Sequence, residues 1–124
     1  MSPETTTSIG RRGEDAALRH LESAGLTLLE RNYRCRGGEI DLVMQEDATL
    51  VLVEVRLRRS LEYGGAAASV GLRKQRRVAL AAKHLMLRRP RYRRMPARFD
   101  VVAIESDTPG GAAEIRWIRD AFRL

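Results

Sequence analysis

Two acidic residues, Asp41 and Glu54, stand in apolar segments that are predicted to form the two strands of a β-hairpin. Residues 38–43 would run out and residues 50–56 would run back, with side chains alternating between the two faces. If the two acids lie opposite each other, their Cβ atoms are about 5 Å apart, and their charges repel unless a cation lies between them. Carboxylate oxygens are hard ligands that favour Mg²⁺ or Mn²⁺. The spacing therefore indicates a divalent metal site.

The length of the hairpin loop decides whether the two acids share a face. A four-residue loop, residues 46–49, would pair Gln45 with Leu50 and put Asp41 opposite Glu54. A loop one residue shorter or longer would put them on opposite faces, where both would be ordinary polar positions of a solvated sheet. The continuous apolar run of the return strand favours the first alternative, because it is typical of a strand buried on both faces.

Glu14 is a third acidic residue in an unexpected place. A helix is expected over residues 8–24, with Gly25 as a left-handed stop. Glu14 lies on the face of this helix that carries Leu18 and Leu21. Either the helix dipole favours an acid in the first turns, or this edge of the helix leans over the hairpin and offers a third carboxylate.

The order of the elements predicts the fold class. Besides the hairpin and the first helix, we expect an edge strand at residues 26–34, a helix from Ser69 to just before Pro90, a strand at residues 99–104 and a short strand at residues 115–118. The order α-β-β-β-α-β-β is typical of an α/β fold with a mixed β-sheet flanked by helices. A chain of 124 residues with 44% hydrophobic content can bury one core. We therefore expect a single domain over residues 8–124 after a disordered tail, residues 1–7.

Positive charge is concentrated in the middle of the chain. Residues 51–98 carry 14 basic residues against two acidic ones. Such a segment predicts salt-sensitive, largely sequence-independent binding to nucleic acid, and the alternative is a solvated arginine-rich surface. Aromatic residues make up only 5% of the chain, which favours duplex or branched DNA over single strands. The residues expected to contact DNA are Arg58, Arg59, Arg73, Lys74, Arg76 and Arg77.

Cysteine content and hydropathy exclude other classes of protein. The single cysteine, Cys35, leaves no intrachain disulfide and no Cys/His cluster with zinc-binding spacing. Charged residues precede any apolar run near the N-terminus, and no stretch approaches eighteen uninterrupted apolar residues. We therefore expect a cytoplasmic protein that does not enter a membrane.

The hairpin residues resemble the motif of a known group of nucleases. Asp41, followed thirteen residues later by Glu54-Val55-Arg56, is similar to the PD-(D/E)xK signature in the arrangement used by archaeal-type Holliday junction resolvases. More closely, the chain resembles the YraN family of small uncharacterised bacterial proteins, described as endonuclease-like, over nearly its whole length. The segments that carry this resemblance are residues 10–17, 31–34, 37–42, 53–56 and 98–102.

The resemblance implies a fold, an activity and a set of site residues. The fold would be restriction-endonuclease-like, and the activity would be Mg²⁺- or Mn²⁺-dependent hydrolysis of phosphodiester bonds in duplex or branched DNA. By analogy with junction resolvases it also implies a homodimer. The implied metal ligands are Asp41, Glu54, the Val55 carbonyl and Glu14; Arg56 takes the position of the motif lysine, Gln75 is a further catalytic residue, and Glu39 is an acid next to the ligands.

The chain departs from the nuclease pattern at two positions. Ile40 stands where the motif has proline, a change that loose versions of the motif tolerate. Arg56 stands where the family usually has lysine, and a guanidinium with a pKa above about 12 cannot act as a neutral base. Only two of the 23 basic residues are lysine, so drift towards arginine also explains the replacement. The alternative function is therefore a catalytically weak or inactive nuclease-fold module that binds DNA or a DNA-processing partner.

Overall fold

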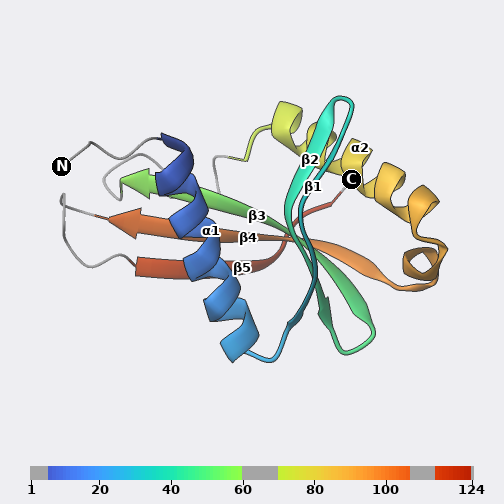
Figure 1. The fold of residues 1–124 in the computed structure, drawn as a ribbon, viewed down its shortest axis with the longest axis horizontal. Coiled ribbons are helices and arrows are strands. Elements are labelled where there is room, and N and C mark those ends of the chain that lie inside the picture. The colour runs from blue at the N-terminus through green and yellow to red at the C-terminus, as the bar shows by residue number, and fades with distance from the viewer. Residues whose placement is uncertain (1–5, 60–69, 107–113, 124) are drawn as a thin grey trace.

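The computed structural model describes residues 6–59, 70–106 and 114–123. These residues form a five-stranded sheet with a long helix on each face (Figure 1). The elements in chain order are α1 (Thr6–Ser23), β1 (Thr27–Cys35), β2 (Gly38–Glu46), β3 (Thr49–Arg59), α2 (Leu72–Arg88), the 3₁₀ helix η2 (Pro90–Arg94), β4 (Ala97–Ser106) and β5 (Glu114–Phe122). The predicted α/β class and the predicted order of helices and strands are confirmed.

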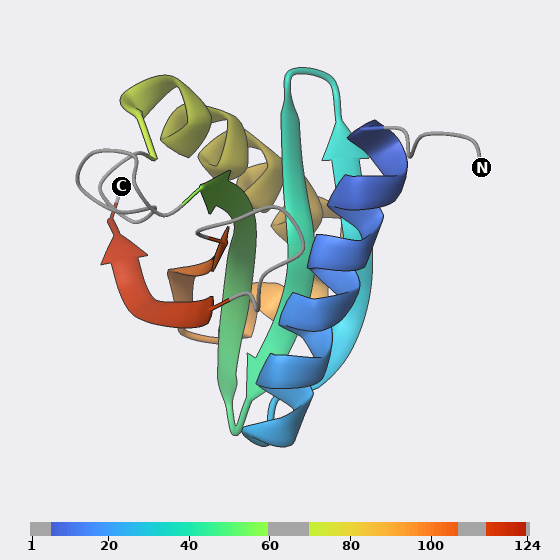
Figure 2. The same cartoon turned by 90° about the vertical axis from the view of Figure 1, so that its left-hand side faces the viewer.

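The sheet is mixed because one pair of neighbouring strands is parallel. The strand order is β1-β2-β3-β4-β5; β3 and β4 run parallel, and the other neighbours are antiparallel. A tight turn cannot join parallel neighbours, and α2 lies in the connection between them. This crossover puts α2 on one face of the sheet, while α1 covers the other face (Figure 2).

Alternating residues of the central strand β3 contribute to two cores. Val51 and Val53 pack in the cluster of Leu21 from α1, whereas Leu52 packs in the cluster of Leu85 from α2. All five side chains are at most 1% exposed. Burial of each such side chain stabilises the fold by about 1.5–3 kcal/mol. The strand is therefore buried on both faces, as its continuous apolar run predicts, and the predicted site lies towards one end of it.

The hairpin between β2 and β3 has the predicted register but a shorter loop. Gln45 pairs with Leu50, as predicted, and Glu46 also pairs with Thr49. The loop is therefore the two residues between them, with Asp47 in the left-handed region at a φ of 51°, and the prediction of four loop residues was wrong. Aspartate tolerates this conformation, so the ladder continues through one more pair. One additional pair of residues in the ladder shortens the loop by two residues, so Asp41 and Glu54 still lie on the same face of the sheet.

The start of α1 also differs from the prediction. The helix begins at Thr6 rather than at Ser8, so Thr6 and Thr7 belong to it and not to a tail; the rest of the expected tail lies outside the described residues. Threonine and serine are all good capping residues, and several occur in a row here, so the sequence does not single out one start. Gly25 has a φ of 100° and forms the predicted left-handed stop.

The end of α2 agrees with the prediction, and its start does not. The helix ends at Arg88, just before Pro90, but it begins at Leu72 after the N-cap Gly71, two residues later than a cap at Ser69 implies. The expected cap, Ser69, and the expected loop at residues 62–68 lie outside the described residues. Neither α-helix of the described chain is both long enough and apolar enough to span a membrane.

The last strand is longer than predicted. It was expected at residues 115–118, but β5 covers Glu114–Phe122. Pairing with β4 continues across an irregularity and ends with Phe99 opposite Phe122. Most side chains of this edge strand are exposed or half-buried, so its second half lacks the alternating pattern by which strands are predicted.

Candidate metal centre and active site

The two hairpin acids lie together at the open end of the hairpin, away from its turn. Leu42 pairs with Val53, and continuing this register by one residue puts Asp41 opposite Glu54. The backbone N–H of Val55 donates a hydrogen bond to Asp41 Oδ2 at 2.8 Å. The carboxylate of one strand therefore takes a backbone donor of the other, and this contact holds the two acids at the same place in the sheet.

Glu54 is the most unusual group of this site. Its residue is only 4% exposed, and its Oε2 atom is buried with no hydrogen-bond partner among the described residues. Burial, together with the negative charge of Asp41, raises the pKa of Glu54 to about 8. An unsatisfied buried carboxylate oxygen is costly. The folded chain therefore leaves this acid in need of either a proton or a cation.

Asp41 shows the same electrostatic strain in weaker form. Burial raises its pKa, the N–H of Val55 works against this, and the nearby charge of Glu14 raises it further. Two like charges at one buried place cannot both ionise freely. The pair therefore favours binding a positive charge.

The chain itself brings a positive charge to this pair. Lys74, in the first turn of α2, has its Nζ atom 3.3 Å from Glu54 Oε1 and 3.1 Å from Glu39 Oε1. Burial alone would lower the pKa of Lys74, but the carboxylates of Glu54 and Glu39 raise it above its ordinary value. In return, the hydrogen bond from Lys74 lowers the pKa of Glu39. Lys74 was predicted to contact DNA and, with Gln75, to touch the scissile phosphate or orient water, but its contacts with these acids were not predicted.

A close backbone approach positions Lys74 over the acids. Gly38, at the start of β2, lies so near α2 that a Cβ atom there would collide with the backbone oxygen of Arg77. Glycine is the residue that permits such an approach. The beginning of α2 can therefore pack directly on the hairpin, which puts its first-turn lysine beside Glu54.

Glu14 of α1 approaches the site from the other helix but has a partner of its own. Its Oε1 atom lies 3.5 Å from Arg31 Nε, and Arg31 also contacts Asp15 at 2.6 Å. The negative charge of Glu14 contributes to the raised pKa of Asp41. Glu14 is the ninth residue of α1, beyond the first turn in which the helix dipole favours an acid, and its role as a third carboxylate of the site stays a prediction.

The other predicted site residues have varied positions. Gln75 donates to the backbone oxygen of Val70 at 2.9 Å, so in this conformation it holds the start of α2. Arg56 is half-buried and lies two residues beyond Glu54 on β3, on the same side of that strand. The side chains of Arg58 and Arg59 lie outside the described part of the structure. The exposed bases of the first half of α2 are Arg73, Arg76 and Arg77.

The donor set fits a hard cation only in part. The described residues contain no group of three or more His, Cys, Asp or Glu side chains that could hold a metal ion. Mg²⁺, however, is commonly held by one or two carboxylates, with water and substrate phosphate as the other ligands. Asp41 and the unpartnered oxygen of Glu54 fit such an open site, and the Val55 carbonyl stays a predicted ligand. Glu14 and Glu39 are held by Arg31 and Lys74, respectively.

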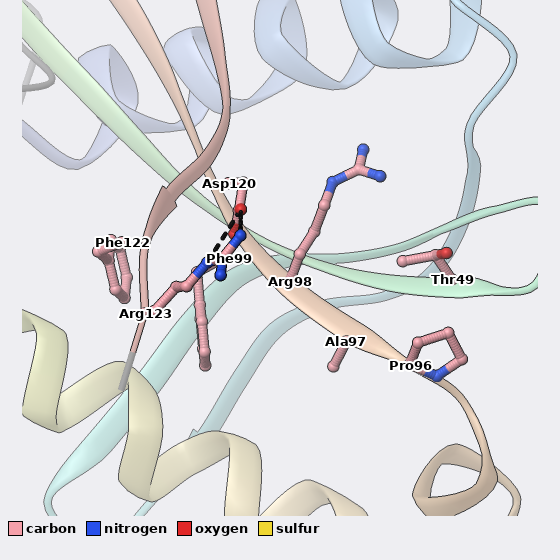
Figure 3. Close-up of a pocket in the computed structure, with 8 residues that line it drawn as sticks. All are labelled: Thr49, Pro96, Ala97, Arg98, Phe99, Asp120, Phe122 and Arg123. Carbon is pink, nitrogen blue, oxygen red and sulfur yellow. Dashed lines mark hydrogen bonds and ion pairs between the residues drawn. The ribbon is translucent and has the colours of Figure 1, made fainter.

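A hollow of the described structure lies away from these acids. It measures about 560 Å³ and contains none of the predicted site residues (Figure 3). The rings of Phe99 and Phe122 stack in its wall with centroids 4.9 Å apart. Arg123 reaches Asp120 at its rim. The acidic site is thus a feature of the sheet surface under α2 and not of this hollow.

Comparison with known proteins identifies relatives of the whole chain. Residues 13–104 match the model of "Uncharacterised protein family UPF0102". The chain is 53% identical over 122 residues to the UPF0102 protein HEAR0176 of Herminiimonas arsenicoxydans, with 97% of this chain and 91% of that protein covered. It is 50% identical over 115 residues to a UPF0102 protein of Stutzerimonas stutzeri (strain A1501), with 93% and 94% covered.

These matches include every predicted site residue from Glu14 to Arg77. The names of these relatives describe a family and no activity. They confirm the resemblance to the YraN family, which is the same family. The chain therefore belongs to protein family UPF0102.

Proposed function

We propose that this protein is a metal-dependent endonuclease that hydrolyses phosphodiester bonds in duplex or branched DNA in the cytoplasm. The single observation that carries the proposal is the buried, unpartnered Oε2 atom of Glu54 beside Asp41. Structural carboxylates are normally satisfied inside a fold. An acid left incomplete at the open end of a hairpin, next to a basic helix, is better explained as a ligand for a cation that contacts phosphate.

Mg²⁺ or Mn²⁺ would be held by Asp41, Glu54 and the Val55 carbonyl, with Glu14 contributing directly or through water. When bound, the ion supplies Lewis-acid activation of the phosphate and lowers the pKa of a coordinated water. Asp41 and Glu54 would supply the negative charge that holds it. Val55 supports this geometry, because its N–H donates to the Oδ2 atom of Asp41 and fixes the position of that carboxylate.

Two basic residues would stabilise the charge that develops on the phosphate. Arg56 is positively charged at every working pH and can make paired contacts to phosphate oxygens, but it cannot accept a proton. Lys74 supplies the compact ammonium that Arg56 lacks, and its Nζ atom already lies 3.3 Å from Glu54. Once the charge of Glu54 is balanced, Lys74 is able to turn from the acid to a phosphate oxygen.

The basic beginning of α2 would hold the DNA backbone. Arg73, Arg76 and Arg77 are exposed there, and the whole of α2 contains no acidic residue. Neutralising these three residues together should flatten the dependence of log Kd on log salt by about three counterions. Titrations of labelled duplex DNA at several salt concentrations measure this slope, and an unchanged slope would move the DNA-binding surface elsewhere.

A DNA-binding module without catalysis is the second candidate. Two observations favour it: Arg56 replaces the usual lysine, and Lys74 already neutralises Glu54 within the folded chain. Such a site would hold phosphate through its bases without activating water. It would keep the salt-dependent DNA affinity and lack any dependence on divalent ions.

A cleavage assay separates the two functions. Linear, flap, single-stranded and four-way-junction DNA are incubated with Mg²⁺ or Mn²⁺ and the wild type, Asp41→Asn or Asp47→Asn. Asp47 is a matched control, because it is an exposed aspartate at the opposite end of the same hairpin. Cleavage that is lost in Asp41→Asn and retained in Asp47→Asn supports the nuclease. Cleavage equal in all three proteins indicates contamination, and its absence with every substrate and ion favours the binding module.

A further inference from the structure

Helix α2 exposes leucines on the face that points away from the sheet. Leu72, Leu80 and Leu87 are 68%, 47% and 70% exposed. The buried residues of the same helix, Val78, Ala81, Ala82 and Leu85, point towards the sheet on the opposite side. Leu72 and Leu87 stay more than two-thirds exposed in the described structure, and Leu80, whose Cδ2 atom lies beside Gly37, stays about half exposed. They mark a surface that another molecule can cover.

Basic residues lie between these leucines on the same line. The sequence positions Arg76, Leu80, Lys83 and Leu87 are separated by four, three and four residues, and all four side chains are exposed. Residues three and four apart are neighbours on one helix face, and this alternation is the spacing by which one helix contacts another. From Arg76 to Leu87 the line is about 16 Å long, at 1.5 Å per residue. We name these four residues the outer seam of α2.

The composition of the outer seam argues against three other occupants. DNA would contact the basic residues Arg76 and Lys83 through its phosphates, but the leucines between them would contribute nothing to these contacts. A second copy of α2 would place basic side chains against basic side chains, which repel each other, because the helix has no acidic residue. A lipid surface favours cations at the flanks of an apolar face, whereas Arg76 and Lys83 lie within the line of leucines.

We propose that the outer seam is the docking surface for an acidic amphipathic helix of a partner protein. Apolar side chains of that helix would cover Leu80 and Leu87, and its carboxylates would pair with Arg76 and Lys83. Such charge complementarity selects the partner and its register. The inference does not depend on nuclease activity. Because Arg76 is also a proposed DNA contact, a bound partner would weaken DNA binding.

A designed peptide tests the docking surface on the full-length protein. The probe is a fluorescein-labelled 21-residue helical peptide in which leucine and glutamate alternate at the a and d positions of the heptad repeat. The control is a peptide with the same residues in scrambled order. Fluorescence anisotropy at physiological salt should give at least tenfold tighter binding of the helical peptide than of the scrambled one. Leu80→Ser/Leu87→Ser should remove this difference, with folding checked by circular dichroism.

Charge reversal makes the test independent of folding defects. Arg76→Glu/Lys83→Glu should lose the glutamate peptide and bind the same peptide with lysine in place of glutamate. The matched control is Arg93→Glu/Arg116→Glu, which reverses two exposed bases outside α2 and should still bind the glutamate peptide in preference to the lysine peptide.

Three results would overturn the proposal. One is equal binding of the helical and scrambled peptides by the wild type. Another is leucine-dependent binding to vesicles containing anionic lipid without binding of the peptide, which would identify a membrane surface. The third is self-association in sedimentation velocity that disappears in Leu80→Ser/Leu87→Ser, which would identify a second copy as the occupant.

Discussion

Two buried acids on neighbouring strands of this sheet differ in whether their carboxylate oxygens have hydrogen-bond partners. Asp100 of β4 is 0% exposed and accepts hydrogen bonds from Arg98 Nε at 3.0 Å, Trp117 Nε1 at 2.9 Å and the backbone N–H of Asp120 at 2.8 Å. Glu54 of β3 is 4% exposed and retains an oxygen without a partner. The residue types and the burial are similar. The difference is whether the folded chain completes the hydrogen bonds of the acid.

The surroundings of Asp100 form a structural network. Arg98 also reaches Glu46 at 2.9 Å, and Arg119 reaches the same carboxylate at 2.7 Å while its guanidinium covers the Trp117 ring at 3.8 Å. These contacts join the turn of the hairpin to the edge strand β5. These hydrogen bonds satisfy both oxygens of Asp100 and leave neither of them for a ligand, although the Nη2 atom of Arg98 is buried with no hydrogen-bond partner among the described residues.

The comparison shows that burial of an acid does not by itself indicate function. Asp100 is more buried than Glu54, yet its charge is used within the fold. Glu54 has an oxygen without a partner, a like charge opposite it and the ammonium of Lys74 beside it. Candidate ligand sites are therefore found by asking which buried acids remain unsatisfied.

The largest expected effect comes from neutralising each acid with its amide. Asp100→Asn should destabilise the protein by about 3–5 kcal/mol, because the guanidinium of Arg98 loses its buried partner. Glu54→Gln should leave the free energy of unfolding at pH 7 unchanged or raise it, because burial and the charge of Asp41 disfavour the ionised form of Glu54 in the folded state. Urea unfolding of the two variants measures both values. An equal loss of unfolding free energy in the two variants would contradict the proposed difference between Asp100 and Glu54.

The next effect is a pH dependence of stability that comes from the titration of Glu54. Its pKa is about 8 in the folded chain and 4.5 as the ordinary value, so the folded state holds a proton that the unfolded state releases. Stability should therefore be fully present below about pH 4.5 and fall as the pH rises through 8, by an amount on the order of a few kcal/mol. Glu54→Gln should lack this fall between pH 5 and 9. A wild type and a variant with parallel profiles in urea unfolding would contradict the assigned shift.

A smaller effect is expected from divalent ions. At an ion concentration 100 times its Kd, binding to the folded state raises stability by about 2.7 kcal/mol. Mn²⁺ should raise the melting temperature of the wild type and of Asp47→Asn, but not that of Asp41→Asn. Thermal melts with Mn²⁺ and with a chelator make this comparison. An identical response of all three proteins would show that Asp41 is not a ligand.

The smallest effect concerns the residue that replaces the motif lysine. Arg56→Lys should raise a weak cleavage activity about tenfold, which corresponds to about 1.4 kcal/mol of transition-state stabilisation. DNA affinity should stay within a few-fold, because the charge is unchanged. Single-turnover cleavage and anisotropy titration measure the two quantities. A strong wild-type activity that falls in Arg56→Lys would instead identify the guanidinium as the better catalytic group.

The sequence by itself determined the framework of the site. Hydrophobic periodicity predicted the order of strands and helices, and the distance between Asp41 and Glu54 predicted that they face each other. These features depend on local alternation and on the hairpin turn, both of which are encoded within about fifteen residues. The predicted loop was two residues too long. This error did not change which side chains share a face, because side chains of a strand alternate with a period of two residues.

Only the tertiary structure decided how each acid is completed. The lysine beside Glu54 comes from the crossover helix, and two of the donors to Asp100, Trp117 and the backbone of Asp120, come from β5. Such contacts join residues about twenty positions apart, and no sequence period indicates which donor reaches which carboxylate. The orientation of Gln75 towards Val70, away from the acids, depends on the same packing. The sequence pattern therefore predicts where the acidic residues lie, and tertiary packing determines which of their oxygens remain without a partner in the fold.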